Sequence, residues 1–240
     1  KCDLVEPQIV ARAYSGRAKA QVELANIVPD DLETLLQNAI KDYQQARKHK
    51  DSPELISGLA KTACALGAFY FDSAMKPDTL LKARLKGLSN AVTLFELATG
   101  LEKDNSLLQK KLFAALTQRG LALLEANRLT DAIADFDRVP KENPAELQAL
   151  VGRGIAHQLL GTPDDLKKAE ADFTAALAID PNQLRALRGR GEIRLSNKDY
   201  DGAISDLQKA HDGDEPGAKT PLIDAHSKRA DVRMNAKDYP

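Results

Sequence analysis

The chain contains no tryptophan, and all its aromatic residues together make up only 5% of its 240 positions. Residues with a high helix propensity, such as alanine, leucine, lysine and glutamate, are abundant instead. Sandwiches and barrels of β-strands are rich in aromatic and β-branched residues. The composition therefore favours an all-α fold over those classes.

The two cysteines, Cys2 and Cys64, are too few for a disulfide framework or a zinc site. Cys64 stands in an alanine- and leucine-rich stretch, where we expect it to act as a small buried hydrophobic residue. The 4 histidines are scattered without the spacing of metal ligands, so no metal is expected. No apolar run approaches the roughly 20 residues of a membrane-spanning helix, and we expect no membrane insertion.

The charge balance also excludes a class of partner. Lys and Arg total 34 against 35 Asp and Glu, which gives a formal charge of −1 with the two signs interspersed. Proteins whose main partner is nucleic acid need a basic surface, because affinity comes from neutralised phosphates. The sequence therefore predicts no nucleic-acid partner.

One pattern occurs three times between Phe113 and Ala210. Each copy has leucine, arginine and glycine at fixed spacing, followed by a small residue four places before a large hydrophobic one. The copies are Leu116-x2-Arg119-Gly120 with Ala132-x3-Phe136, Leu150-x2-Arg153-Gly154 with Ala169-x3-Phe173-x2-Ala176, and Leu187-x2-Arg190-Gly191 with Ala203-x3-Leu207-x2-Ala210. Pro144 and Pro181 are predicted to start the helices that follow. Self-similarity of this period indicates a repeat array.

The pattern resembles the tetratricopeptide repeat, which has a period of about 34 residues. The resemblance implies an all-α fold, a right-handed superhelical array of antiparallel helix hairpins (an α-solenoid). A glycine within a helix costs about 1 kcal/mol relative to alanine. A glycine that recurs at the same position of each repeat therefore needs a packing reason. We expect the glycine and the facing alanine to let paired helices approach closely, while Phe136, Phe173 and Leu207 fill the space between hairpins.

The repeats divide the chain into three parts. Residues 105–217 are predicted to hold three repeats, at about 113–146, 147–183 and 184–217, and residues 218–240 the first helix of a further, truncated repeat. Residues 1–104 are predicted to form two divergent long-helix hairpins, either repeat-like or an N-terminal cap, in which the glycine signature is lost. Because the last unit is half a repeat, we expect the parent protein to continue beyond residue 240.

Helix starts can be placed at several points. Asp30 or Asp31 is predicted to cap a helix with its carboxylate, and Ser52 is predicted to cap another, followed by a proline that needs no partner at the first helical position. Pro77 and Asp78 are predicted to start a further long helix.

Arginine precedes each repeat glycine, where the family usually has leucine, and aspartate precedes each large hydrophobic residue. We predict the pairs Arg119–Asp135, Arg153–Asp172 and Arg190–Asp206 across the hairpins. The alternative is a ladder of arginines that binds phosphate or carboxylate ligands, and the recurrence of aspartate favours the pairs. At a partly exposed site each pair would contribute only ~0–1 kcal/mol.

Catalytic motifs are absent. There is no Gly-x-Ser-x-Gly, no phosphate-binding glycine loop and no paired cysteine and histidine. Gly152 and Gly154 lie within helical periodicity, and His157, which replaces the usual tyrosine of the family, is expected to be a satisfied half-buried side chain. We therefore expect neither an enzyme nor a cofactor.

The resemblance implies a concave face lined by the first helix of each hairpin, suited to an extended peptide or a partner helix. The positions that match the family's lining are Thr117, Leu121, Leu124, Val151, Ile155, Gln158, Arg185, Arg188, Glu192, Leu195, Ser227 and Asp231. The first two copies contribute mostly apolar residues and the third charged ones, which suggests a ligand with a hydrophobic segment beside an acidic or mixed one. Alternatively, the N-terminal helices or the turns after Asn105 cover the apolar part.

Family members that hold the acidic tails of chaperones use lysine and asparagine on these first helices. Here Thr117, Leu121, Val151 and Ile155 stand at the matching places, so chaperone-tail binding is disfavoured. The leading hypothesis is a protein–protein interaction scaffold that binds a peptide or partner domain on its concave face. The alternatives are a self-assembly module that forms a homo-oligomer, and a regulatory or substrate-recruiting segment of a larger enzyme.

Overall fold

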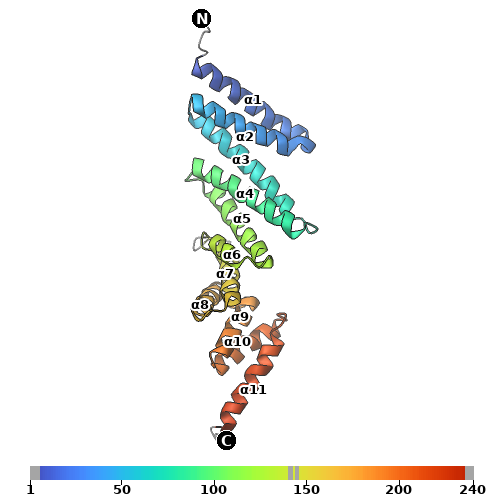
Figure 1. Cartoon of the computed structure of the whole chain (residues 1–240), viewed down its shortest axis with the longest axis vertical. Helices are drawn as coiled ribbons and strands as arrows, with labels where there is room; N and C mark the ends of the chain where they lie inside the picture. The colour runs from blue at the N-terminus through green and yellow to red at the C-terminus, as the bar shows by residue number, and fades with distance from the viewer. Residues whose placement is uncertain (1–5, 140–142, 144–145, 236–240) are drawn as a thin grey trace. The chain divides into compact units, whose positions relative to one another are not determined.

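The described part of the chain is helical throughout. The structure is a computed structural model that describes residues 6–139, 143 and 146–235. These residues form eleven α-helices and one 3₁₀ turn at Pro29–Asp31, and no strand occurs among them (Figure 1). The all-α fold predicted from the sequence is confirmed. The chain divides into two compact units, residues 1–119 and 120–240, with the division inside helix α5 (Ser106–Glu125).

Unit 1 consists of hairpins that follow one another along the chain. Helix α1 (Pro7–Ile27) packs against α2 (Leu32–His49), and α3 (Pro53–Ala74) packs against α4 (Leu81–Leu101). Helix α2 also packs against α3, which joins the two hairpins. A cluster of buried residues, including Leu36, Ile40, Leu59 and Leu66, packs α1, α2 and α3 together. These hairpins lie in the part of the chain for which the sequence predicts two long-helix hairpins, and the assignment of residues 1–104 as a separate part stays a prediction.

One predicted helix cap and one predicted helix start in unit 1 are wrong. Neither Asp30 nor Asp31 caps α2 with its side chain, because both lie in the 3₁₀ turn, where Leu32 donates its N–H to the Pro29 carbonyl. Helix α4 begins at Leu81 rather than at Pro77, because Thr79 donates its N–H to the Lys76 carbonyl and closes a turn.

The start of α3 follows the prediction. The Ser52 hydroxyl accepts the backbone N–H of Leu55 at 3.4 Å, and Pro53 occupies the first helical position. This helix start could be predicted from the sequence because the capping hydroxyl and the N–H that donates to it lie within one turn.

Unit 2 continues the same arrangement with shorter helices. It contains α6 (Leu129–Phe136), α7 (Glu146–Leu160), α8 (Pro163–Ile179), α9 (Leu184–Ser196), α10 (Tyr200–Asp212) and α11 (Lys219–Asn235). Helix α7 pairs with α8 and α9 pairs with α10, and α11 packs on α10. The first helices also touch in succession, α7 with α9 and α9 with α11. This succession brings residues of separate repeats onto one side of the unit.

The start of α9 departs slightly from the prediction. It begins at Leu184 rather than at Pro181, because the Asp180 carboxylate accepts the N–H of Asn182 at 3.0 Å and holds a turn before the helix. Pro144, predicted to start the preceding first helix, lies outside the described residues. The repeat boundaries and the truncated last repeat remain proposals.

Two phenylalanine rings of unit 2, those of Phe136 and Phe173, each lie between two glycines. A Cβ added at Gly154 would come within 2.7 Å of the Phe173 ring, and one added at Gly189 within 2.5 Å. Phe136 has the same relation to Gly120 and Gly152. One glycine comes from the ring's own hairpin and the other from the next hairpin. The structure thus confirms that the ring fills the space between hairpins, and it explains both glycines of the Gly-Arg-Gly sequences.

The glycine signature was predicted to be lost before residue 104, and this prediction is wrong. A Cβ at Gly67 would meet the Phe95 ring at 2.9 Å, and one at Gly58 would meet the Tyr43 ring at 2.7 Å. Leu66 stands before Gly67, where the repeats of unit 2 have arginine. A search for the Arg-Gly pair therefore misses this hairpin, although Gly67 lies against the Phe95 ring as Gly154 lies against the Phe173 ring.

Candidate partner-binding face

The repeated arginines bind the repeated aspartates. Arg153 donates hydrogen bonds to both carboxylate oxygens of Asp172, at 2.9 and 2.6 Å, and Arg190 does the same with Asp206, at 2.8 and 2.9 Å. Each pair joins the two helices of one hairpin, as predicted. The third predicted pair, Arg119–Asp135, stays a prediction.

The carboxylates of these pairs are more enclosed than the sequence led us to expect. The side chains of Asp172 and Asp206 are 9% and 4% exposed. A charge that is buried to this degree is costly without its partner. The expectation of ~0–1 kcal/mol for each pair assumed a partly exposed site, and it is therefore too low for the loss of either arginine.

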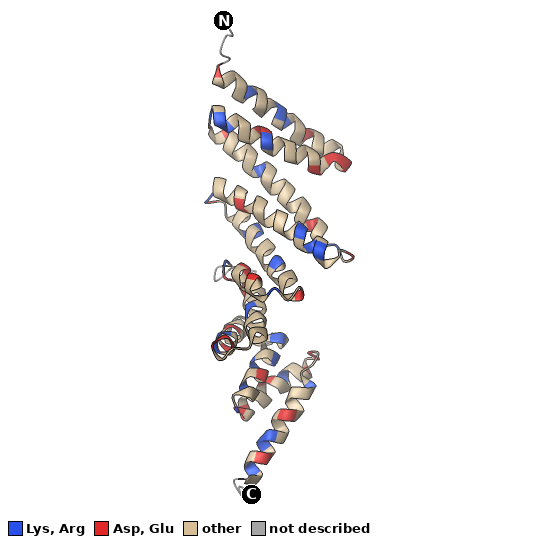
Figure 2. Cartoon of the chain, in the orientation of Figure 1, with Lys and Arg blue, Asp and Glu red and all other residues tan. Residues whose placement is uncertain are grey.

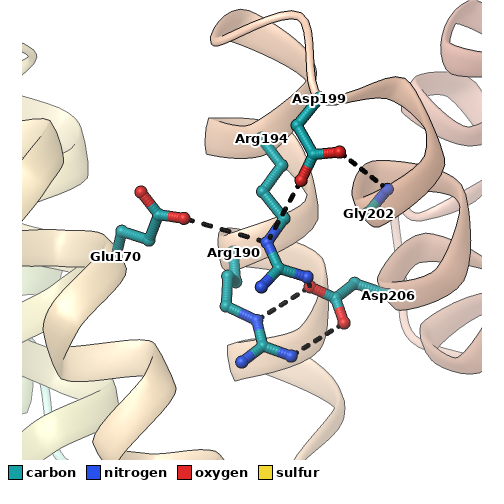
Figure 3. Close-up of polar contacts among 6 residues, drawn as sticks. All are labelled: Glu170, Arg190, Arg194, Asp199, Gly202 and Asp206. Carbon is teal, nitrogen blue, oxygen red and sulfur yellow. Dashed lines mark hydrogen bonds and ion pairs between the residues drawn. The ribbon is translucent and has the colours of Figure 1, made fainter.

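A further arginine, Arg194, forms ion pairs around the Arg190–Asp206 pair. Figure 3 shows Arg194 sharing Asp206 with Arg190, at 2.9 Å, while its guanidinium lies 3.8 Å from Glu170 and 3.9 Å from Asp199. Asp199 also accepts the N–H of Gly202 at the start of α10. Because these bonds link α8, α9 and α10 internally, they favour the structural interpretation over a ligand-binding ladder.

Arg153 is similarly engaged. It donates a further hydrogen bond to Asp137 at 2.6 Å. The hydrogen bonds that Arg153 donates to the aspartates, Asp172 first, raise the pKa of Arg153 above its ordinary value, and the hydrogen bonds that Arg190 donates to Asp206 raise the pKa of Arg190 in the same way. The guanidinium charge of Arg153 is thus compensated by two carboxylates of unit 2.

A fourth pair of this kind was missed from the sequence. In unit 1, Arg17 donates through Nε and Nη2 to the two oxygens of Asp42. Asp42 precedes Tyr43 as Asp172 precedes Phe173, and Arg17 precedes the fully buried Ala18. An arginine followed by a small residue, rather than by glycine, was the signal that could have revealed it.

His157 has a hydrogen-bond partner, as expected, but it is buried rather than half-buried. Its side chain is 9% exposed, and its Nδ1 lies 3.0 Å from an Asp165 oxygen. A hydrogen bond from the Thr162 hydroxyl, followed by the contact with His157, lowers the pKa of Asp165. No group of three or more possible metal-binding side chains occurs among the described residues.

The predicted lining residues differ in how much surface they offer. Arg185, Ser227 and Asp231 are exposed. Leu121, Leu124, Ile155, Gln158, Arg188 and Glu192 are half-buried. Thr117, Val151 and Leu195 are only 1%, 7% and 9% exposed, which leaves them little surface for a partner. Thr117 belongs to unit 1, and all the others belong to unit 2.

Polar contacts join several of these residues across repeats. Gln158 on α7 donates to Glu192 on α9 at 2.7 Å. Arg188 donates to the Pro216 carbonyl at 2.8 Å, and its Nε lies 3.9 Å from Glu192 and 3.7 Å from Glu215. The charge of Arg188 is therefore compensated within the unit.

Arg185, one turn earlier on α9, is exposed and forms no ion pair with any residue that the structure describes. It is the cation of this face that a ligand can reach without first displacing a carboxylate. Both signs of charge occur on the helices of each unit (Figure 2). None of the helices in the described ranges has the length and apolarity to span a membrane.

A comparison with protein families decides the identity of the repeats. The family model of the tetratricopeptide repeat matches residues 117–165 and 164–218. Residues 117–218 are tetratricopeptide repeats. Domains of this family are typically protein-interaction modules and usually non-catalytic, and no enzyme family is evident in the chain.

Related proteins share only part of the chain. An "FK506-binding protein-like" protein of Mus musculus is 38% identical over 74 residues, which are 31% of this chain and 20% of that protein. "Hsp70-Hsp90 organizing protein 2" of Arabidopsis thaliana is 26% identical over 98 residues, 40% of this chain and 16% of that protein. The chain thus matches no more than about a fifth of the length of these curated relatives.

Solved structures with related helical arrangements include crystal structures of MamA and a complex of yeast Sti1. MamA matches 80% of this chain and 95% of its own, at 18% identity and a TM-score of 0.45. The "TPR2AB-domain:pHSP90-complex of yeast Sti1" matches 91% of this chain and 99% of its own, at 13% identity and a TM-score of 0.41.

Proposed function

We propose that this chain is a protein–protein interaction scaffold whose tetratricopeptide repeats bind a peptide or partner domain on the side formed by their first helices. The observation that carries the proposal is the succession of first helices α7, α9 and α11, which touch one another and bear exposed polar residues. Surfaces made of successive repeats suit extended ligands, because each repeat contributes a few contacts along a line.

The exposed charges indicate which ligand groups would bind. Arg185 is uncompensated and would attract a carboxylate, while Asp231 on α11 would attract a basic group. Leu121, Leu124 and Ile155 are half-buried apolar residues that would contact an apolar segment. We therefore propose a ligand with an apolar segment followed by charged residues of both signs.

The contact set is narrower than the family's lining positions. Thr117, Val151 and Leu195 are buried, so the proposal depends on the nine other positions. Thr117 and Val151, together with Leu121 and Ile155, also stand where relatives that hold chaperone tails carry lysine and asparagine. We propose that the partner is not an acidic chaperone tail held in that manner.

Affinity capture with a charge-preserving variant tests the proposal. The double substitution Arg185→Glu and Asp231→Lys reverses two exposed charges on α9 and α11 and keeps the net charge of the chain. The control, Lys209→Glu with Asp212→Lys, makes the same exchange on the second helix α10, at two exposed positions. Partners recovered by the wild-type chain and by the control, but at least tenfold less by the face variant, would support the proposal. Equal recovery by all three chains would contradict it.

A further inference from the structure

Unit 1 contains a surface trough on α2, α3 and α4, and the residues that line it are not part of the tetratricopeptide pattern found in the sequence. Two adjoining cavities of about 500 and 590 Å³ lie on the surface of α2, α3 and α4. Both cavities are lined by Gln37 of α2, Tyr70 of α3 and Asn90 of α4. The shared residues make them one continuous trough, with the second helices α2 and α4 as its sides.

The length of the trough sets the size of its ligand. Its lining runs along α2 from Glu33 to Gln44 and along α4 from Ala83 to Leu94. A helix rises 1.5 Å per residue, so either side is about 17 Å long. An extended chain advances about 3.3 Å per residue. The trough therefore accommodates about five residues of an extended peptide.

One polar side chain in the centre of the trough has no internal partner. Gln37 donates to Glu33 at 3.1 Å and to the Tyr70 hydroxyl at 2.9 Å, and that hydroxyl donates to Glu33 at 2.6 Å. By contrast, the Asn90 carboxamide makes no side-chain hydrogen bond within the part of the chain that the structure describes. Asn90 is half-buried and lines both cavities.

A free carboxamide complements the backbone of an extended peptide. It offers two donors and one acceptor, and each residue of an extended peptide presents one N–H and one C=O that need partners on leaving water. A helical ligand would satisfy these groups itself and gain nothing from Asn90. The unpartnered amide therefore favours an extended ligand.

The charges of the trough indicate the side chains of the ligand. Lys41 lines one cavity and Lys86 lines the other, and both are exposed. The one carboxylate of the lining, Glu33, already accepts hydrogen bonds from Gln37 and Tyr70. The trough thus presents one available cation in each cavity, which is complementary to acidic side chains.

We infer that this trough binds an extended, acidic peptide segment of a partner protein, with Asn90 bonded to the peptide backbone and Lys41 and Lys86 paired with its carboxylates. The site lies on second helices of unit 1, so it is separate from the proposed first-helix face of unit 2.

A random heptapeptide phage library, selected on the whole 240-residue chain, supplies the probe. Enriched peptides are synthesised with a fluorophore, and their binding is measured by fluorescence anisotropy. We expect aspartate or glutamate in the enriched peptides. Asn90→Ala should weaken binding about tenfold, because it removes one or two hydrogen bonds to a desolvated peptide backbone. Joint replacement of Lys41 and Lys86 by alanine should weaken binding and reduce its dependence on salt.

Matched variants separate binding from folding. Asn38→Ala removes the same side chain from α2 outside the trough, and it should change the affinity less than twofold. Asn90→Asp keeps the size of the side chain but adds a negative charge. It should lower the affinity for an acidic peptide at least as much as Asn90→Ala does. Circular dichroism melting curves establish that each variant is folded.

Several results would overturn the inference. A selection that enriches no peptide overturns it, and so does a selection that enriches basic or helical peptides. Acidic peptides that bind the wild type and Asn90→Ala with equal affinity also overturn it. Peptides that lose affinity with Arg185→Glu instead would belong to the face of unit 2. A dimer in light scattering that dissociates on Asn90→Ala would show that a second copy of the chain, not a partner peptide, occupies the trough.

Discussion

Arg153 holds Asp172 by two parallel hydrogen bonds across the α7–α8 hairpin. Asp172 directly precedes Phe173, whose ring is packed between Gly154 and Gly189. The ion pair and the aromatic ring therefore both fix the same turn of α8 against its neighbouring helices. Arg190 with Asp206, and Arg17 with Asp42, repeat the ion pair in other hairpins.

The first prediction concerns the cost of leaving Asp172 without its partner. Arg153→Met should lower the free energy of unfolding by about 3 kcal/mol, because a nearly buried carboxylate loses its compensating charge. The double variant Arg153→Met with Asp172→Leu should recover most of that loss, since no charge is left uncompensated. Urea unfolding followed by circular dichroism measures both.

An exposed ion pair provides the control. Arg128 and Asp131 form an i,i+3 pair with side chains 59% and 50% exposed. Arg128→Met should change the stability by less than about 0.5 kcal/mol. If the double variant at Arg153 and Asp172 were as unstable as the single one, the burial of the carboxylate would not be the cause.

The second prediction concerns the glycine next to the Phe173 ring. Gly154→Ala should destabilise the chain by about 1–2 kcal/mol, although alanine is the better helix former, because the new methyl group would overlap a ring held on its other side by Gly189. Gly16→Ala, on α1, has no atom within 4 Å of the added carbon and should stabilise the chain by about 1 kcal/mol. Thermal or urea unfolding measures the sign of the stability change in each variant. A Gly154→Ala variant more stable than the wild type would contradict the proposed packing.

The third prediction concerns acid. Hydrogen bonding from Thr162 and His157 lowers the pKa of Asp165, so the folded state favours the ionised carboxylate. The resulting stabilisation is fully present above the unfolded pKa of about 3.9 and is lost as the pH falls through the lower, folded pKa. The difference in melting temperature between wild type and Asp165→Asn should therefore be constant from pH 7 to about 5 and shrink below about pH 4. A difference that stays constant down to pH 2.5 would show that ionisation of Asp165 contributes nothing.

The sequence predicted the hairpins and the ion pairs of unit 2 because both depend on residues at fixed spacing within a repeat. Arg153, Asp172 and Phe173 each recur in register, so a local pattern carries the information about a contact across the hairpin. The same reasoning missed Arg17 and Asp42, because Ala18 replaces the glycine that marks the register. It also placed Val151 and Leu195 on an accessible face, since spacing gives the direction of a side chain but not the depth of its burial.

The trough could not be predicted from the sequence. Its central residues, Gln37, Tyr70 and Asn90, come from three helices and share no motif. Which faces of those helices meet depends on the packing of unit 1 as a whole. Likewise, Arg188 resembles Arg185 in the sequence, and only the contacts with Glu215 and Pro216 distinguish the compensated arginine from the free one.

The central claim, that a partner binds along the first helices of unit 2, is tested most directly by site-specific photo-crosslinking. The photoreactive residue p-benzoylphenylalanine is placed at the exposed Ser227 on α11 or, as a control, at the exposed Lys209 on α10. After irradiation in cells that express the chain, we expect crosslinked partner protein from position 227 and at least tenfold less from position 209. Equal crosslinking at both positions, or crosslinking at 209 alone, would contradict the proposed binding face.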